Sequence, residues 1–198
     1  MIKFIKLRQE KPYLIFKEKY EEAYEKGQKN IEAIAISSYN KENMEVDSRF
    51  VNLKFIEGNE FIFFSNFNSP KSISFKSHNQ ISALFYWSSI NVQIRMKALI
   101  NRKPHQYNQS YFKTRSTYKN ALAISSSQSK EIKSFEDVIK KYNYTKERKD
   151  LTKCPSYWGG FAFIPYHFEF WVGNDSRLNK RDLYKIKDDE WNHTIIEP

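Results

Sequence analysis

The sequence predicts a mainly β fold, in which an antiparallel sheet or barrel carries helices inserted between its strands. Strand-like runs follow one another as hairpins joined by short turns, and helical segments interrupt them. A parallel sheet is disfavoured, because each parallel pair would need a long crossover connection. The 198 residues suffice for one domain with a sizeable core, and the 17% of aromatic residues supply large rings to fill it.

The N-terminal part contains one predicted helix and three predicted strands. The helix covers Pro12–Gly27, because proline suits the first turn, glycine suits the C-terminal cap and aromatic residues recur at helical spacing. Residues 31–37 alternate with a period of two, as a half-buried strand does. Two further strands, 49–56 and 60–65, are joined by residues 57–59, where glycine and asparagine tolerate the positive φ of a hairpin turn.

The rest of the chain repeats this pattern of helices and paired strands. Ser69 and Pro70 suit the N-cap and first position of a short helix. Ser134 and Asp137 begin another helix as a capping box does. The predicted helices are 69–79, 104–126 in two pieces, and 134–144, with a basic loop or frayed helix end over 140–153; the predicted strands are 81–87, 92–100, 160–164, 167–172, 183–186 and 191–196. We expect a single domain, 1–198, with an N-terminal helical arm over 1–30 and a helical insertion over 104–150.

Charge and cysteine content narrow the classes of protein. The net charge of +10 indicates an anionic partner, such as nucleic acid, anionic lipid or a phosphorylated small molecule, or else serves solubility alone. The single Cys154 cannot form an internal disulfide, which favours a reducing compartment, and we expect a cytoplasmic protein. The apolar runs are too short for a membrane span, and the first residues have no uninterrupted apolar core of a secretory signal.

Several kinds of site are disfavoured by the sequence. The four histidines are widely spaced and no Cys-x-x-Cys pair occurs, so no metal site is predicted. Cys154 has no basic residue near it in sequence to activate a thiolate. The chain contains neither a GxGxxG pattern nor a P-loop pattern.

Basic residues in the strands and short loops, interleaved with hydroxyl and amide side chains, remain as candidates. Taken singly, each basic residue is more often part of an ion pair than of a binding site. Lys71 stands in the first turn of a predicted helix, where phosphate is favoured. Gln93 and Arg95 alternate on one strand and so face the same way. Tyr111 and Arg115 are four residues apart and would share a helix face.

Seven segments, read together and in order, resemble the pyridoxine (pyridoxamine) 5′-phosphate oxidase family. They are SRFVNLK (48–54), FFSNFNSPK (63–71), LFYW with QIR (84–95), YFKTR (111–115), SQS (127–129), SYWGGF (156–161) and EFWVGNDSRLNKR (169–181). The last two are the most specific combinations. The resemblance implies an FMN-binding split β-barrel, and a homodimer with FMN at the subunit interface.

The resemblance also implies roles for individual residues. The substrate would be a phosphorylated B6 vitamer, oxidised to pyridoxal 5′-phosphate with O2 as acceptor and H2O2 as product. Neither nucleic acid nor a membrane is an expected partner. Arg177 and Asn179 would be catalytic, and Lys54, Tyr111, Arg115 and Lys119 would bind substrate. The expected FMN-binding residues are Arg49, Phe50, Val51, Asn52, Phe64, Ser65, Lys71, Gln93, Gln128, Ser129, Trp171 and Arg181.

Three positions depart from the family pattern. Asn179 replaces a histidine, so the imidazolium charge is lost there. Pro70 replaces an arginine of the FMN phosphate loop, and Lys119 replaces a substrate-phosphate serine. These changes favour a second interpretation, in which a flavin-binding relative acts on another substrate or serves as a binding protein. A third, a nucleic-acid-binding barrel, would account for the charge and the aromatic residues.

Overall fold

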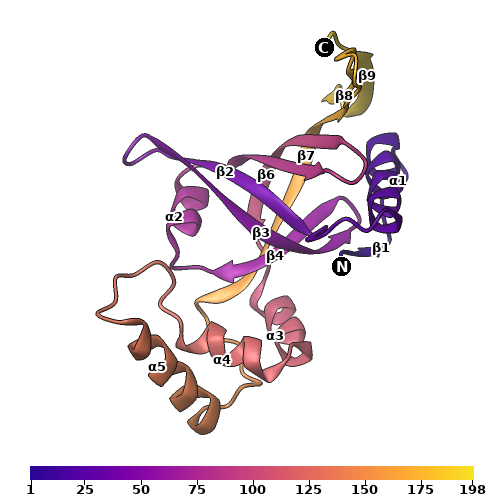
Figure 1. Ribbon diagram of the computed structural model, residues 1–198. Coiled ribbons are helices and arrows are strands. Elements are labelled where there is room, and N and C mark those ends of the chain that lie inside the picture. The colour runs from indigo at the N-terminus through magenta and orange to yellow at the C-terminus, as the bar shows by residue number, and fades with distance from the viewer.

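The computed structural model describes residues 1–198 and consists of nine strands and five helices (Figure 1). The strands are β1 (Lys3–Ile5), β2 (Ala33–Asn40), β3 (Glu45–Glu57), β4 (Glu60–Asn66), β5 (Gln80–Trp87), β6 (Val92–Arg102), β7 (Trp158–Val172), β8 (Lys180–Lys187) and β9 (Glu190–Ile195). The helices are α1 (Lys11–Glu25), α2 (Pro70–Ser77), α3 (His105–Thr114), α4 (Thr117–Ser125) and α5 (Phe135–Arg148). None of these helices is long and apolar enough to cross a membrane.

Six of the strands close into an antiparallel barrel. Strand β2 pairs with β3 and β5, and β6 pairs with β5 and β7. Strand β4 pairs with both β3 and β7, and this completes the ring. Strands β8 and β9 continue the sheet beyond β7, and β1 joins the end of β3 as the only parallel pair. The predicted antiparallel barrel with inserted helices is therefore confirmed.

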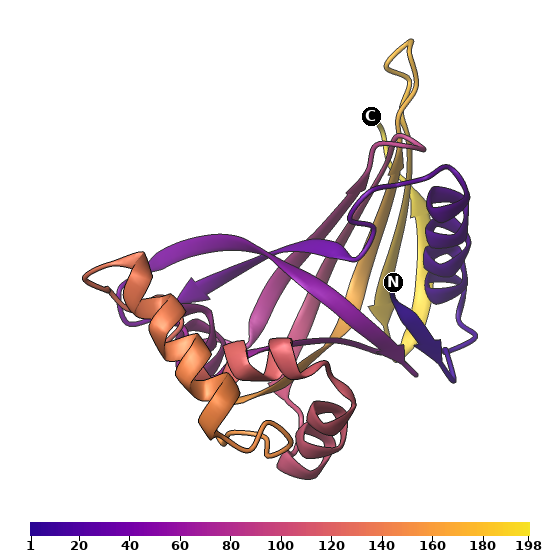
Figure 2. The same cartoon turned by 60° about the horizontal axis from the view of Figure 1, so that its bottom comes forward.

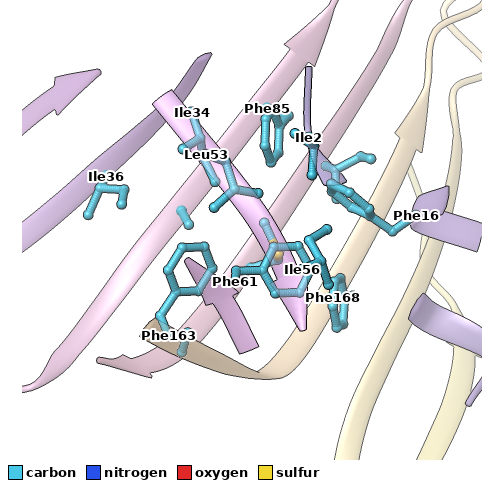
Figure 3. Close-up of a cluster of buried hydrophobic side chains, with 14 of the residues drawn as sticks. Ile2, Phe16, Ile34, Ile36, Leu53, Ile56, Phe61, Phe85, Phe163 and Phe168 are labelled. Carbon is cyan, nitrogen blue, oxygen red and sulfur yellow. The ribbon is translucent and has the colours of Figure 1, made fainter. Parts of the chain in front are cut away.

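The barrel is filled by apolar side chains that alternate along its strands (Figure 3). On β6, Val92, Ile94, Met96, Ala98 and Ile100 all point inward and are buried, whereas the residues between them are not. Helix α1 covers one side of this core with its predicted aromatic face. Phe16 of α1 is fully buried and meets the rings of Phe61 and Phe85 edge-on, at centroid distances of 5.1 and 5.4 Å. Each such ring removes a large apolar area from water, so the aromatic residues fill the core, as expected.

Two predicted strands form one, which corrects the sequence analysis. Residues 160–164 and 167–172 both belong to β7, which runs without a break through Pro165. Opposite it on β6, Ala98 pairs with Pro165 but Lys97 pairs with His167, so Tyr166 is an extra residue in a β-bulge. A bulge tolerates proline because the ladder hydrogen bonds are interrupted there.

One strand and one helix end differ from the prediction. The short strand β1 was not predicted. Helix α5 extends to Arg148, so much of the stretch 140–153, predicted as a loop or frayed helix end, is helical. The N-cap of α5 is as predicted, since the Asp137 amide donates to Ser134 Oγ at 3.3 Å. Helices α3, α4 and α5 lie together at one end of the barrel, away from α1 (Figure 2).

Candidate functional site

A cleft of about 320 Å³ lies where strands β3 and β4 meet helices α3 and α4. Strands β3 and β4 supply side chains from neighbouring positions of one hairpin, and the helices close the opposite side. The lining residues are Phe50, Val51, Asn52, Lys54, Phe64, Ser65, Lys71, Tyr111, Arg115, Lys119, Gln128 and Trp158. All of them except Trp158 were selected from the sequence, so segments from four parts of the chain converge as expected.

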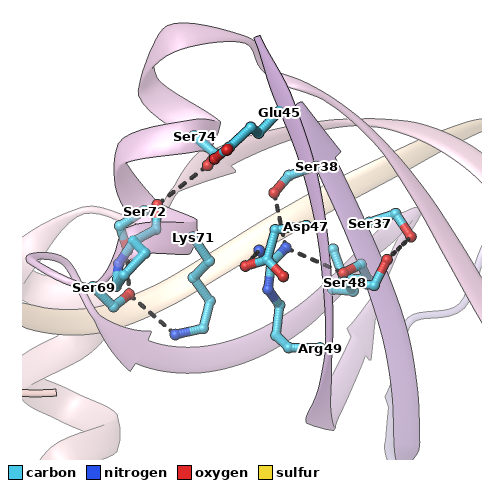
Figure 4. Close-up of polar contacts among 12 residues, drawn as sticks. Ser37, Ser38, Glu45, Asp47, Ser48, Arg49, Ser69, Lys71, Ser72 and Ser74 are labelled. Carbon is cyan, nitrogen blue, oxygen red and sulfur yellow. Dashed lines mark hydrogen bonds and ion pairs between the residues drawn. The ribbon is translucent and has the colours of Figure 1, made fainter. Parts of the chain in front are cut away.

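Two neighbouring cations lie at one end of the cleft: Lys71 lines it, whereas Arg49 lies beside Lys71 but outside the lining (Figure 4). Lys71 lies in the first turn of α2, is 7% exposed, and donates from Nζ to Ser69 Oγ at 3.0 Å. Burial and the nearby Arg49 lower the pKa of Lys71 to about 8. The Arg49 guanidinium donates to Ser38 Oγ at 2.8 Å and pairs with Asp47. Two buried or half-buried cations therefore share one carboxylate, and the charge left over suits an anion.

A second group of cations lies across the cleft, around Arg115. This residue ends α3, and its Nη2 donates to the Lys119 carbonyl at 3.3 Å. Its Nη1 is buried and has no hydrogen-bond partner, and burial lowers the pKa of the guanidinium. Burial and the charges of Lys119 and Arg115 also lower the pKa of Lys54, against the opposing effect of Glu32. An oxyanion at this end would satisfy a donor that the protein itself leaves unpaired.

Three aromatic rings stack along the wall of the cleft and link its parts. The ring of Phe64 lies 3.9 Å from that of Tyr111 and 5.2 Å from that of Trp158, with interplanar angles of 25° and 14°. Trp158 was missed in the sequence analysis, although it belongs to the SYWGGF segment. In the sequence, a tryptophan at the start of a strand resembles an ordinary core residue. The two glycines that follow Trp158 were the only signal that it belongs to a binding site.

Comparison with known proteins identifies the family. A protein from Coxiella burnetii named pyridoxine/pyridoxamine 5′-phosphate oxidase is 32% identical over 184 residues, which span 92% of this chain and 93% of that protein. The chain belongs to the pyridoxine/pyridoxamine 5′-phosphate oxidase family. A chloroplastic member from Arabidopsis thaliana is 33% identical over 89% of this chain, which spans 34% of that longer protein. Proteins so named are oxidoreductases, and the predicted membership of an oxidase family is confirmed.

The C-terminal segment matches a model of this family, and two solved structures share the fold. Residues 158–198 match the family model described as the pyridoxine 5′-phosphate oxidase C-terminal dimerisation region. PhzG from Burkholderia lata 383, solved with tetrahydrophenazine-1-carboxylic acid, shares the fold with a TM-score of 0.90 at 21% identity, over 95% of this chain and 93% of PhzG. A pyridoxamine 5′-phosphate oxidase-related FMN-binding protein from Nostoc punctiforme has a TM-score of 0.77 at 13% identity, over 96% and 99% of the two chains.

Some residues expected at the oxidase site lie outside the cleft, within or opposite the dimerisation region. Trp171 on β7 pairs with Gln93 on β6 and with Arg181 on β8. Arg177 and Asn179 lie in the connection between β7 and β8, where Asn179 Oδ1 accepts from the Asn174 amide at 3.0 Å. Within one chain, therefore, none of these five side chains lines the cleft. Ser129 follows the lining residue Gln128 but is exposed.

Glu169 is a buried carboxylate that sequence reasoning missed. It is 2% exposed on β7 and accepts from Arg181 Nη2 at 2.8 Å, with Arg95 Nη2 at 3.2 Å from its other oxygen. Its position in the EFW segment was the available signal, because an acidic residue directly beside aromatic core residues needs a partner. Glu169 holds the guanidinium of Arg181 in place on the face of the sheet.

Two other features of the chain lie away from this chemistry. Burial raises the pKa of the Cys154 thiol to about 11, so it is protonated at neutral pH. Its Sγ donates to the Trp158 carbonyl at 3.5 Å, which is a structural role. A larger hollow of about 500 Å³ lies between α2 and the end of β6 and contains none of the residues selected from the sequence.

Proposed function

We propose that this protein oxidises pyridoxamine 5′-phosphate or pyridoxine 5′-phosphate to pyridoxal 5′-phosphate, with FMN as cofactor, O2 as acceptor and H2O2 as product. The amine substrate also consumes one water and releases ammonia, whereas the alcohol does not. The observation that carries the proposal is a single cleft with two separate cationic groups, one around Lys71 and one around Arg115. Two groups fit two phosphates, one on the cofactor and one on the substrate. FMN, when bound, supplies the hydride acceptor, so the protein has to bind and orient the two molecules.

The end of the cleft at α2 fits the FMN phosphate. Lys71 and Arg49 provide two cations with one carboxylate between them, and the N-terminal turn of α2 adds its partial positive charge. Pro70 removes the cation that family members carry at that position, so the pair bears the whole charge. Phe50, Val51, Asn52, Phe64, Ser65, Gln128 and Ser129 are proposed to surround the rest of the cofactor.

The end at α3 fits the substrate phosphate. The unpaired Arg115 Nη1 would donate to a phosphate oxygen, with Tyr111 beside it. Lys54 and Lys119 add positive charge, and Lys119 offers an ammonium where the family usually has a serine. This gain of charge offsets the loss of the histidine at position 179.

A second copy of the chain is proposed to complete each site. Trp171, Gln93 and Arg181 lie on the outer face of the sheet, and Arg177 and Asn179 on the adjoining connection, so a partner must bring them to the cleft. The match of residues 158–198 to the dimerisation region supports this arrangement. In it, FMN lies at the subunit interface, and Arg177 and Asn179 approach the substrate from the partner copy.

Absorption spectroscopy together with an activity assay tests the proposal. The purified protein is expected to bind FMN, with flavin absorption bands in the visible blue, and to form pyridoxal 5′-phosphate with equimolar H2O2. A flavin-loaded protein that turns over neither phosphorylated vitamer would contradict the proposal. It would favour the second candidate, a flavoprotein with another substrate, for which the PhzG fold match and Asn179 provide support. In that case Asn179→His distinguishes the two, because it restores turnover only if the missing imidazole limits a vitamin oxidase.

The lowered pKa of Lys71 predicts how FMN affinity depends on pH. Bound phosphate stabilises the protonated amine, so binding raises a pKa that is about 8 in the free protein. The affinity for FMN is therefore expected to change little with pH below about pH 8. Above that pH it should weaken, by up to about tenfold per pH unit. Titrations between pH 7 and 9.5 with FMN and with riboflavin measure this slope. Riboflavin, which has no phosphate, and the Lys71→Met variant should both give flat profiles, and a slope retained in that variant would contradict the assignment.

A further inference from the structure

Arg115 is a half-buried cation for which the protein provides no counter-ion, and its Nη1 atom is buried. No carboxylate forms a salt bridge with it, and the one hydrogen bond from its guanidinium goes to the Lys119 carbonyl. Two other cations, Lys54 and Lys119, line the same cleft, and the carboxylate of Glu32 pairs with Lys54 at 3.9 Å rather than with Arg115. Because no carboxylate balances its charge, the Arg115 guanidinium needs another favourable contact. That contact must leave Nη1 without a hydrogen-bond partner.

The ring of Trp158 supplies that contact. The Arg115 guanidinium carbon lies 4.2 Å from the centroid of the Trp158 ring and 5.5 Å from that of Phe112. The negative face of an indole attracts a cation more strongly than a phenyl ring does. The planar guanidinium can stack on this face while its edge nitrogens remain free to donate.

Trp158 is itself held rigidly. It is 5% exposed, stacks on Phe64 at 5.2 Å, and meets the edge of Phe112 at 5.1 Å. Its carbonyl accepts from Cys154 Sγ, and its backbone is part of β7 where that strand pairs with β4. The barrel wall therefore fixes the indole, and the indole fixes the plane of the arginine.

We infer that Trp158 is a positioning residue for the substrate phosphate: it stabilises the unpaired charge of Arg115 and holds the guanidinium plane where Arg115 lines the cleft. The inference rests on the proposed function, since it assigns the phosphate to Arg115. A cation–π contact of this kind changes affinity by about twofold to thirtyfold. Trp158 acts only through Arg115, so its effect disappears when Arg115 is absent.

A double-mutant cycle tests this inference by calorimetry on the FMN-loaded protein. The probe is 4-deoxypyridoxine 5′-phosphate, which has no oxidisable group, compared with 4-deoxypyridoxine. Trp158→Leu is expected to weaken binding of the phosphorylated probe by about twofold to thirtyfold. It should leave binding of the unphosphorylated probe and the Kd of FMN unchanged. Trp158→Phe, which keeps a ring, should recover most of the loss, and Trp158→Leu should have no further effect in an Arg115→Met background.

Tyr107→Leu is the matched control. The Tyr107 ring also stacks on Phe64, at a centroid distance of 6.4 Å, but the rings beside the Arg115 guanidinium are those of Trp158 and Phe112. Removal of Tyr107 should therefore leave the preference for the phosphorylated probe intact. Independent, additive effects of Trp158→Leu and Arg115→Met would overturn the inference, as would equal losses for both probes. If the wild-type protein shows no preference for the phosphorylated probe, the proposed function fails as well. If Arg115→Met removes that preference while Trp158→Leu retains it, only the inference fails.

Discussion

Arg49→Met is expected to raise the Kd of FMN by roughly 10-fold to 150-fold, because a hydrogen bond to a charged group contributes about 1.5–3 kcal/mol. With Pro70 in the phosphate loop, Lys71 and the neighbouring Arg49 are the proposed cations for the FMN phosphate, so one of two charges is lost. Fluorescence quenching of FMN on binding measures the Kd. The control is Arg8→Met, which removes an exposed arginine that pairs with Glu10 and should leave the Kd unchanged.

The same variant has a second expected result. The charge of Arg49 contributes to the low pKa of Lys71, so its removal raises that pKa. The pH above which FMN affinity declines should therefore move upward in Arg49→Met. A weakened affinity without this shift would show that the two cations do not act on one phosphate, contrary to the proposed site.

Gly159→Ala is expected to lower the free energy of unfolding by about 1–3 kcal/mol or more, through overpacking. A Cβ at this position would lie 2.2 Å from Asn108 Nδ2 and 2.6 Å from the ring of Phe67. Asn108 cannot easily move, because it is 1% exposed, donates to the Lys103 carbonyl at 3.1 Å and accepts from the Gly160 amide at 2.8 Å. The close approach of β7 to α3 thus requires glycine.

Urea unfolding measures this effect, with a lower midpoint at an unchanged m-value as the expected result. Gly58→Asn is the control: its φ of +59° is one that asparagine tolerates, and no atom lies within 4 Å of the added Cβ. We expect its midpoint to stay near that of the wild-type protein. If the Gly159→Ala variant were as stable as the control, β7 and α3 could move apart without lowering the free energy of unfolding.

The sequence predicted local structure well, because the signals for it are local. Hairpin turns and caps depend on a few neighbouring residues, as Gly58 at φ +59° and the Ser134 cap show. The bulge at Pro165 was not predictable, since a proline in a strand run ordinarily marks a break and only the partner strand β6 reveals the pairing. Closure of the barrel by β4 and β7 likewise depends on residues far apart in sequence.

The candidate site was predictable only in part, and for a physical reason. The residues of the cleft became conspicuous through the family resemblance, and the structure brings eleven of the selected residues together, four of them basic. Trp158 and Glu169 were missed because their roles depend on what they contact, which is Arg115 for Trp158 and Arg181 for Glu169. Burial and pairing, rather than residue type, distinguish them.

The double pairing of β4 constrains the order in which this protein can be made. Strand β4 lies in the first third of the chain, but its partner β7 begins at Trp158, so a ribosome must complete most of the polypeptide before the ring can close. Until then β4 presents an unpaired edge flanked by exposed phenylalanines, which is a template for aggregation. The barrel therefore forms late, after a long-range loop closure that slows folding.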